Sequence, residues 1–214
     1  RNGAHAICEK PLVTREHELS KLVMPDRHNR GKIYPVLQMR EHPVAMWLKD
    51  LGGPVQGSIN YVTPRGSWYQ QSWKAKKEQS GGLLLNIGVH LFDLMLWTFG
   101  EVDINACTAE QQAWNKASGR LVFKNVYRHV EIDWNISLDP DDCPAGIPQR
   151  EFTFNGTTKS IEGVPDLHTR LYEKILTGGG YRMQDAKPAL RLVWALNDKM
   201  DIPRQGNKAS RVFV

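Results

Sequence analysis

The sequence predicts a short α/β unit followed by a larger α+β domain, in which helices cover one face of an open, mainly antiparallel sheet. Three patterns support this fold class. Strand, helix and strand follow one another over the first 40 residues, which is the order typical of a parallel sheet. Apolar and polar residues alternate strictly over residues 130–138, as in a sheet with one solvated face. Residues 80–100 are apolar nearly all the way round a helix, as in a core helix.

The first unit begins with an apolar strand at residues 4–8, which reads as buried. Thr14 can cap a helix that carries two glutamates in its first turn, and Pro25 is expected to end it. A second apolar strand follows at residues 32–40. We place the boundary of this unit after residue 39, where the strand–helix–strand order stops.

The second domain, residues 40–214, is expected to combine helices with an antiparallel sheet. Its hairpin turns at Asn155-Gly156, a residue pair that favours two-residue turns. In chain order, we expect a helix at 42–51, a strand at 57–66, the apolar helix at 80–100, strands at 102–109, 119–126 and 128–138, the hairpin at 150–163, and helices at 166–176 and 185–200.

The composition excludes several classes of protein. The chain has 214 residues and a net charge of +5, and no nucleic-acid-binding motif accompanies its basic cluster at residues 74–77. That cluster is a solvated surface or serves an anionic small substrate. We find no signal peptide and no apolar run of about 18 residues that suggests a membrane span. Three cysteines without a CxxC pair indicate neither a disulfide framework nor a metal site, which fits a reducing cytoplasm.

One polar stripe interrupts the apolar helix at residues 80–100. Asn86, His90 and Asp93 are spaced by four and three residues, so they share one helix face. A carboxylate beside an imidazole fixes the tautomer of the ring and raises its basicity. The simpler alternative is a buried histidine that is hydrogen-bonded for structure alone. The glycines of this helix cost about 1 kcal/mol each relative to alanine, which favours close approach of a ligand or another backbone.

Two further segments carry candidate site residues. Lys10 stands at the carboxyl end of the first strand, the edge of a parallel sheet that faces the ligand crevice, and Pro11 prevents the strand from continuing. Residues 65–74 combine aromatic rings with cations, which suits a sugar- or nucleotide-binding loop. The alternatives are a plain surface lysine and a loop anchored on the core by its aromatic side chains.

The order of these motifs resembles one enzyme family. The segments GAHAICEKPL, YPVLQMR and GGLLLNIGVHLFDLMLWTFGEV are similar to the Gfo/Idh/MocA family of NAD(P)-dependent sugar oxidoreductases, which carry an EKP segment and a D-x-G-x-H-x-x-D helix. Asn86 stands at the first aspartate position of that helix. The segments YVTPRGSWYQQSWKAKKEQSGGLLLNIGVH and DLHTRLYEKILTGGGY resemble one branch, the bacterial UDP-N-acetylglucosaminuronate 3-dehydrogenases, which also carry asparagine there.

The resemblance implies that residues 1–39 are the C-terminal remnant of a dinucleotide-binding (Rossmann) domain. The sequence contains no GxGxxG, so we expect roughly 100 to 120 residues to be missing before it, at about 30 residues per strand–helix unit. We therefore expect a truncated or partly recorded protein. This segment alone is expected to bind NAD poorly and to be inactive, because the pyrophosphate lacks its helix N-terminus.

For the complete enzyme, the resemblance implies oxidation of a secondary hydroxyl on a nucleotide-linked sugar acid by NAD or NADP. Position 3 of UDP-N-acetylglucosaminuronate is the expected reaction site, in the synthesis of surface polysaccharide such as lipopolysaccharide. His90 is expected to act as the general base, and Lys10 to polarise the carbinol oxygen or share the proton relay. Asn86 is expected to position the substrate, and Asp93, grouped with the substrate residues, to orient the imidazole.

The remaining site residues are also implied by the resemblance. Tyr61, like Arg40, lies on the strands nearest the crevice and is a weaker candidate. The residues expected at the cofactor are Glu9, Lys10, Pro11 and Arg40. Those expected at the uronate and the nucleotide are Arg65, Trp68, Tyr69, Trp73, Lys74 and Arg170.

Two alternatives to this function remain. One is a related dehydrogenase or reductase that acts on another sugar or on a cyclitol. The other is a non-catalytic module that binds a sugar nucleotide or serves assembly. In each case the alternating strand at residues 128–138 predicts a homo-oligomer that pairs through the open sheet face, with no nucleic-acid or membrane partner.

Overall fold

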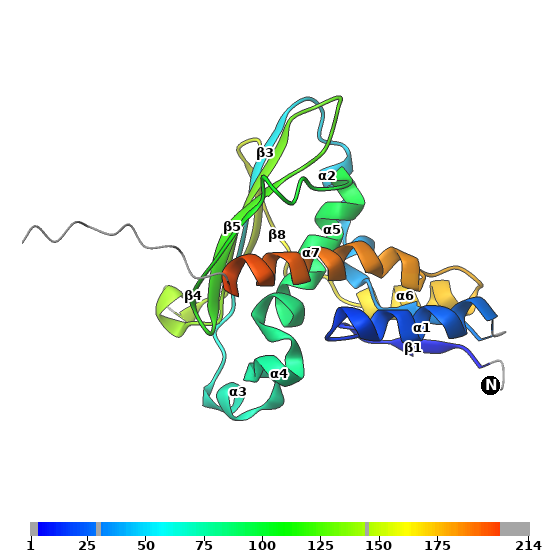
Figure 1. Ribbon diagram of the computed structural model, residues 1–214. Coiled ribbons are helices and arrows are strands. Elements are labelled where there is room, and N and C mark those ends of the chain that lie inside the picture. Colours follow the sequence, from blue (N-terminus) through cyan, green and yellow to red (C-terminus); the bar gives the residue numbers. More distant parts are fainter. Residues whose placement is uncertain (1–3, 29–30, 144–145, 202–214) are drawn as a thin grey trace, which may run out of the picture.

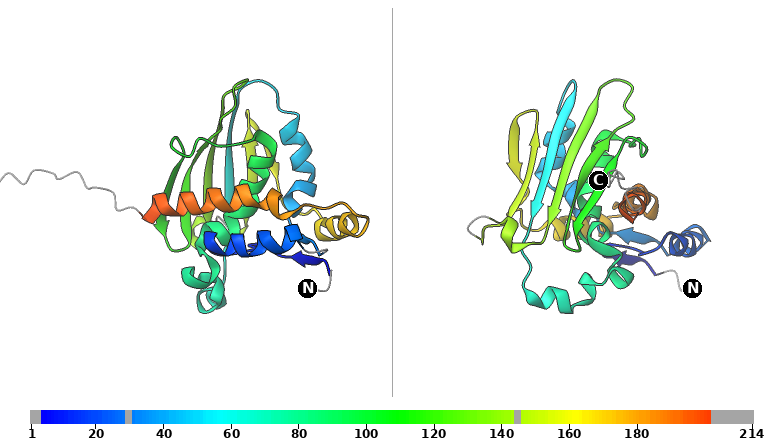
Figure 2. Two further views of the ribbon diagram at one scale, coloured as in Figure 1. Left: turned by 45° about the vertical axis from the view of Figure 1, so that its right-hand side comes forward. Right: turned by 60° about the vertical axis from the view of Figure 1, so that its left-hand side comes forward.

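The computed structural model describes residues 4–28, 31–143 and 146–201, and it confirms the predicted fold class. A small parallel sheet pairs β1 (Ala6–Cys8) with β2 (Ile33–Pro35), and α1 (Glu16–His28) connects the two strands. A larger sheet contains six strands in the order β4-β5-β6-β3-β7-β8. The helices lie on one side of the larger sheet (Figures 1 and 2).

The larger sheet is mainly antiparallel, as the alternating pattern predicts, and only the central pair β3–β6 is parallel. In its register Ile59 of β3 lies opposite Trp134 of β6 and Phe152 of β7, and all three side chains are buried. The hairpin turns at Asn155-Gly156 as expected, since both residues have positive φ. The strands of the larger sheet are β3 (Val55–Val62), β4 (Thr108–Ala113), β5 (Lys116–Val122), β6 (Val130–Ser137), β7 (Gln149–Phe154) and β8 (Thr157–Ser160).

The helices are divided between the core and the edges of the fold. The apolar α5 (Val89–Phe99) packs on α7 (Met183–Asp201) and α2 (Pro43–Lys49). Shorter helices form the connections. They are η1 (Gln38–Glu41), α3 (Ser67–Gln71), η2 (Trp73–Ala75), α4 (Lys77–Ser80), the π turn η3 (Leu84–Gly88), η4 (Pro140–Asp142) and α6 (Leu167–Leu176).

Some element predictions were wrong. α1 continues to His28, past Pro25, because a proline removes only its own backbone donor and can bend a helix without ending it. The strand expected at residues 102–109 begins only at Thr108, since the Asp103 side chain accepts the Asn105 backbone N–H and forms a turn. β1 is not buried, and Ile7 is 43% exposed. In the described residues β1 pairs with β2 alone.

The long apolar segment forms a helical unit with a break and a wide turn. Lys77–Phe99 is long enough to cross a membrane, and the mean hydropathy of its most apolar 18 residues is 1.5, which is high enough for a membrane span. No such segment was expected from the sequence. In the structure, 67% of those 18 residues are buried inside the fold. Gly81 and Gly82 adopt positive φ and interrupt the helix. At Gly88 a Cβ would lie 2.9 Å from Phe92 and 3.2 Å from Ile136, so this glycine admits side chains of the core rather than a ligand.

The C-terminal helices return to the first unit. Leu171 and Ile175 of α6 form a small apolar cluster with Tyr34 and Val36, which belong to β2 and the residue after it. The α7 ribbon lies beside α1 (Figure 2), and α7 also contacts β2, while α6 contacts η1. The carboxyl end of β1 is thereby held beside the domain that carries His90. A division of the chain after residue 39 stays a prediction.

Candidate active site

One cavity gathers most of the residues that the sequence pointed to. Its volume is about 310 Å³, and it lies where the end of β1, η1, β3, β7 and the start of α5 meet. Lys10 and His90, 80 positions apart in the chain, both line it. The full lining is Lys10, Gln38, Met39, Tyr61, Arg65, Trp68, Tyr69, Lys74, Asn86, Ile87, His90, Leu91, Arg150 and Ile161.

Lys10 enters the cavity from the carboxyl end of β1. β1 and β2 run parallel, with Cys8 opposite Pro35, so their carboxyl ends form one edge of the small sheet. The amine Nζ of Lys10 donates a hydrogen bond to the backbone carbonyl oxygen of Asn86. The amine is therefore held against the helical segment that carries His90.

Asn86 lies in the π turn η3, where the helix widens before α5. Such turns interrupt the regular i→i−4 hydrogen bonds and are frequent at functional sites. The backbone oxygen of Asn86 accepts from Lys10, while its side-chain Nδ2 donates to the Tyr69 hydroxyl at 2.6 Å. Asn86 thus connects Lys10 to residues 65–74, which we call the aromatic segment.

The enclosure of the cavity changes the acidity of both predicted catalytic groups. Burial lowers the pKa of Lys10 to about 8; Glu9 acts in the opposite sense, whereas Lys74 and Arg65 reinforce the lowering. Burial also lowers the pKa of His90 well below its ordinary value of 6.5, and the charge of Lys10 adds to this effect. The imidazole is therefore neutral near pH 7, as a general base requires.

Gln38 contacts the His90 ring, a role that the sequence had assigned to Asp93. The Nε2 atoms of Gln38 and His90 are 3.3 Å apart. An amide nitrogen only donates, so His90 Nε2 accepts in this contact and Nδ1 carries the ring hydrogen. The buried Oε1 of Gln38 has no hydrogen-bond partner in the described residues.

Asp93 pairs with Arg40 instead of with the His90 ring, which corrects the contact expected for Asp93. Arg40 Nε and one of its terminal nitrogens donate to the two Asp93 oxygens at 2.8 and 2.7 Å, and the same terminal nitrogen donates to the Asp185 backbone oxygen. The planar guanidinium matches a carboxylate in this bidentate geometry. Both side chains are buried outside the cavity lining, and in the described residues Asp93 contacts Arg40 rather than the His90 ring.

Cations dominate the charge of the cavity. Lys10, Arg65, Lys74 and Arg150 line it, and no aspartate or glutamate among the described residues does. Arg150 is partly neutralised from outside, since its Nε lies 2.8 Å from the Thr63 hydroxyl and 3.4 Å from a Glu162 oxygen. Arg65 has a buried Nε with no hydrogen-bond partner in the described part of the chain. This arrangement suits an anionic ligand.

The structure divides the predicted substrate and cofactor residues. Asn86, Arg65, Trp68, Tyr69, Lys74 and Tyr61 line the cavity together with Lys10 and His90. Trp73 is 53% exposed, and Arg170 is exposed on α6; neither lines the cavity. Glu9 and Pro11 also lie outside the lining, and Glu9 contacts His168 and Tyr172 of α6.

Two polar lining residues, Gln38 and Arg150, were missed in the sequence. Gln38 follows an apolar strand and precedes Arg40. Its position near the end of that strand is the one sequence feature that could have indicated a place in the site. Arg150 lies on β7 with no local motif, so its convergence with Arg65 depends on the pairing of β7 with β3.

Comparison with known proteins identifies a domain and several relatives. The family model of the GFO/IDH/MocA C-terminal domain matches residues 48–162. The curated protein "Oxidoreductase P35" of Formosa agariphila is 27% identical over 175 residues, which cover 74% of this chain and 54% of that protein. The chain thus spans about half the length of this curated relative.

The fold also matches a solved dehydrogenase. The WlbA (WbpB) dehydrogenase of Thermus thermophilus, in complex with NAD and UDP-GlcNAcA, is 32% identical with a TM-score of 0.80; the match covers 92% of this chain and 65% of that one. Its complex with NAD and alpha-ketoglutarate gives 33% identity and a TM-score of 0.79, with coverage of 91% and 64%.

Proposed function

Because the chain belongs to the GFO/IDH/MocA oxidoreductase family, we propose that the complete protein is an NAD(P)-dependent dehydrogenase that oxidises a secondary hydroxyl of a nucleotide-linked sugar acid. The observation that carries this proposal is the cavity that Lys10 and His90 line together with three further cations and, among the described residues, no carboxylate. UDP-N-acetylglucosaminuronate, oxidised at position 3, is the substrate we propose, since the Thermus dehydrogenase was solved with UDP-GlcNAcA. Such a reaction belongs in the synthesis of surface polysaccharide.

In the proposed mechanism the protein moves the hydroxyl proton and stabilises charge on the carbinol oxygen. Neutral His90 takes the proton at Nε2, where the substrate hydroxyl replaces the Gln38 amide as the hydrogen-bond donor. The Lys10 ammonium lies on the Asn86 carbonyl, from which it can donate a second hydrogen to the carbinol oxygen. The uronate lies among the guanidinium groups of Arg65 and Arg150.

The residues present fit a dinucleotide cofactor at one place. The carboxyl edge of β1 and β2, where Lys10 enters the cavity, is the edge at which open α/β sheets bind such ligands. NAD supplies the acceptor of the hydride when bound. We propose that the side chain of Lys10 lies beside the bound cofactor.

We expect the rate to fall above pH 8 because Lys10 acts as a cation. Its pKa is about 8, so the ammonium is present below that pH and is lost as the pH rises through it. His90 is neutral on both sides of this step, because its pKa is lowered. A pH profile of kcat/KM on the complete enzyme should therefore show a descending limb near pH 8. Lys10→Arg, which cannot lose its charge in this range, should move the limb to higher pH, and a rate that rises through pH 8 would contradict the cationic role.

Removal of a cavity guanidinium should weaken binding of the sugar acid. A hydrogen bond to a charged group contributes about 1.5–3 kcal/mol, so Arg65→Met or Arg150→Met should raise KM about 10- to 100-fold. Arg191→Met is the matched control, since Arg191 is exposed on α7, opposite Glu16 and outside the cavity. Steady-state kinetics measure the effect. Equal KM values for the cavity variants and the control would remove the anion site from the proposal.

The function itself is tested by NADH formation with a substrate panel. The complete enzyme should turn over UDP-N-acetylglucosaminuronate and should discriminate against UDP-N-acetylglucosamine, which lacks the carboxylate, and against myo-inositol. Turnover restricted to a neutral sugar or a cyclitol would assign a different dehydrogenase. Binding of the nucleotide sugar with no turnover at any pH would indicate a non-catalytic module.

We also propose that the uncovered sheet face pairs copies of the chain. Its residues are polar but fixed: Asn135 donates to Asn60 and Asn60 to Gln149, each at 2.9 Å, and Arg120 pairs with Asp133 at 2.7 Å. Ordered polar rows of this kind can pair with a second copy at little entropic cost. Light scattering on the complete protein measures the oligomeric state.

A further inference from the structure

A second cavity adjoins the first. Its volume is about 180 Å³, and Tyr69 and Lys74 line both cavities. It lies between the end of α7, strands β4 and β5 with their connecting turn, and the segment from α3 to η3. The residues that matter to its chemistry are Lys74, Lys77, Gln111, Trp114 and Asn197 around Tyr69.

Two aromatic rings form one wall of this cavity. Trp114, in the turn between β4 and β5, stacks with Tyr69 at a centroid distance of 6.3 Å and an interplanar angle of 27°. Trp114 is 46% exposed, whereas Tyr69 is buried behind it. The hydroxyl of Tyr69 reaches Asn86, so one residue connects the catalytic cavity to the aromatic wall. The exposed side of the Trp114 indole, backed by the Tyr69 ring, is a platform for a planar ring.

Two side-chain amides supply polar groups in the same cavity. Gln111 donates to the Ala113 carbonyl at 3.1 Å, and Asn197 donates to the Gly81 carbonyl at 3.4 Å. In the described residues the amide oxygen of neither side chain takes part in a hydrogen bond. These oxygens can accept the N–H of a heterocyclic base.

Lys74 occupies the junction of the two cavities. Its ammonium forms no ion pair within the part of the chain that the structure describes, whereas the neighbouring Lys77 is held by Asp201 at 2.7 Å. An unpaired ammonium suits a phosphate as a point charge. The two cavities therefore provide, in order, a reaction centre, a cation and an aromatic platform.

We propose that the second cavity binds the base of the nucleotide substrate, with Trp114 and Tyr69 as its platform and Lys74 at the diphosphate. The sugar then occupies the first cavity at Lys10 and His90. This inference rests on the proposed function in one respect only, namely that the substrate carries a nucleotide. It adds Trp114, Gln111 and Asn197 to the residues that recognise the substrate.

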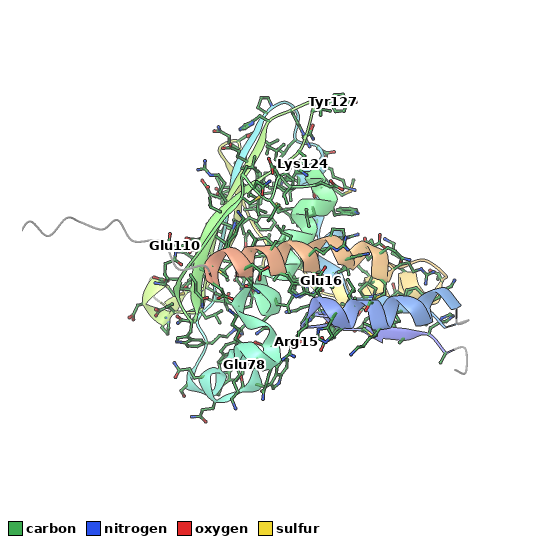
Figure 3. The ribbon with its side chains drawn as sticks, in the orientation of Figure 1. Arg15, Glu16, Glu78, Glu110, Lys124 and Tyr127 are labelled. Carbon is green, nitrogen blue, oxygen red and sulfur yellow. The ribbon has the colours of Figure 1, made fainter. Side chains whose placement is uncertain are left out.

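Binding of UDP alone tests the proposal without turnover. Calorimetric titration of the complete protein with UDP should give a Kd that rises about 10-fold or more in Trp114→Ala, as expected for the loss of one stacked base. Trp114→Phe retains a ring and should recover most of the affinity. Tyr127→Ala is the matched control, because Tyr127 is a 95% exposed aromatic residue at the far end of the sheet from α4 (Figure 3), and its UDP affinity should equal that of the parent.

A substrate that lacks the base separates this inference from the proposed function. Trp114→Ala should raise KM for the UDP-linked acid and leave kinetics with N-acetylglucosaminuronate 1-phosphate unchanged. An unchanged UDP affinity in Trp114→Ala would overturn the inference, even if turnover of the UDP-linked acid stood. Conversely, UDP binding that depends on Trp114 in a protein without turnover would support the inference and overturn the proposed function. Circular dichroism checks that the variants fold.

Discussion

Replacement of His90 by asparagine is expected to lower kcat of the complete enzyme about 100- to 10,000-fold, the range that a positioned general base contributes. Asparagine preserves a side chain of similar size that can still contact Gln38, but it cannot accept the hydroxyl proton. Because the imidazole is half-buried and uncharged, the exchange removes no ion pair, and we expect KM and the unfolding temperature to change little. Stopped-flow measurement of NADH formation isolates the chemical step.

The matched control is His129→Asn. His129 is exposed beside Glu131 at the start of β6, and it does not line the cavity. Its variant should keep the parent kcat. A His90→Asn enzyme that retained kcat within a few-fold of the parent would show that the base is another group, of which Lys10 is the nearest candidate in the same cavity.

The largest expected effect on stability comes from the buried Arg40–Asp93 pair. Asp93→Ala leaves the Arg40 guanidinium buried without its carboxylate, and loss of one partner of a buried ion pair costs about 3–5 kcal/mol. The pair joins η1 to α5, and η1 carries Gln38, so the imidazole should also lose its fixed tautomer. Urea denaturation measures the free energy of unfolding.

A double variant distinguishes the buried charge from the packing around it. Arg40→Met combined with Asp93→Leu removes both charges and should recover most of the lost stability, because an apolar replacement of a buried ion pair is often neutral. Arg191→Ala is the control for an exposed pair: Arg191 and Glu16 are 58% and 69% exposed, so we expect a much smaller loss of stability than in Asp93→Ala. If Asp93→Ala cost no more than Arg191→Ala, the pair would not hold η1 in place.

Local sequence patterns predicted the parts of the fold that depend on neighbours in the chain. The alternation from Val130 to Leu138 marked β6, and the Asn155-Gly156 pair marked the hairpin of β7 and β8, because both signals depend on the chain within a few residues. The helix spacing correctly placed Asn86 and His90 toward one cavity. The same spacing misled for Asp93, since a shared helix face does not say which neighbouring element meets each side chain.

The sequence by itself determined the element types, the family resemblance and the two side chains proposed for the reaction, Lys10 at a strand end and His90 on a core helix. Only the tertiary structure decided that both line one cavity, that Gln38 rather than Asp93 meets the imidazole, and that Arg150 and Trp114 lie near the same aromatic segment. The physical reason is that backbone periodicity fixes the direction of a side chain relative to its own element. The partner across a gap is fixed by packing, strand register and the approach of distant charges, none of which is encoded within a short window of sequence.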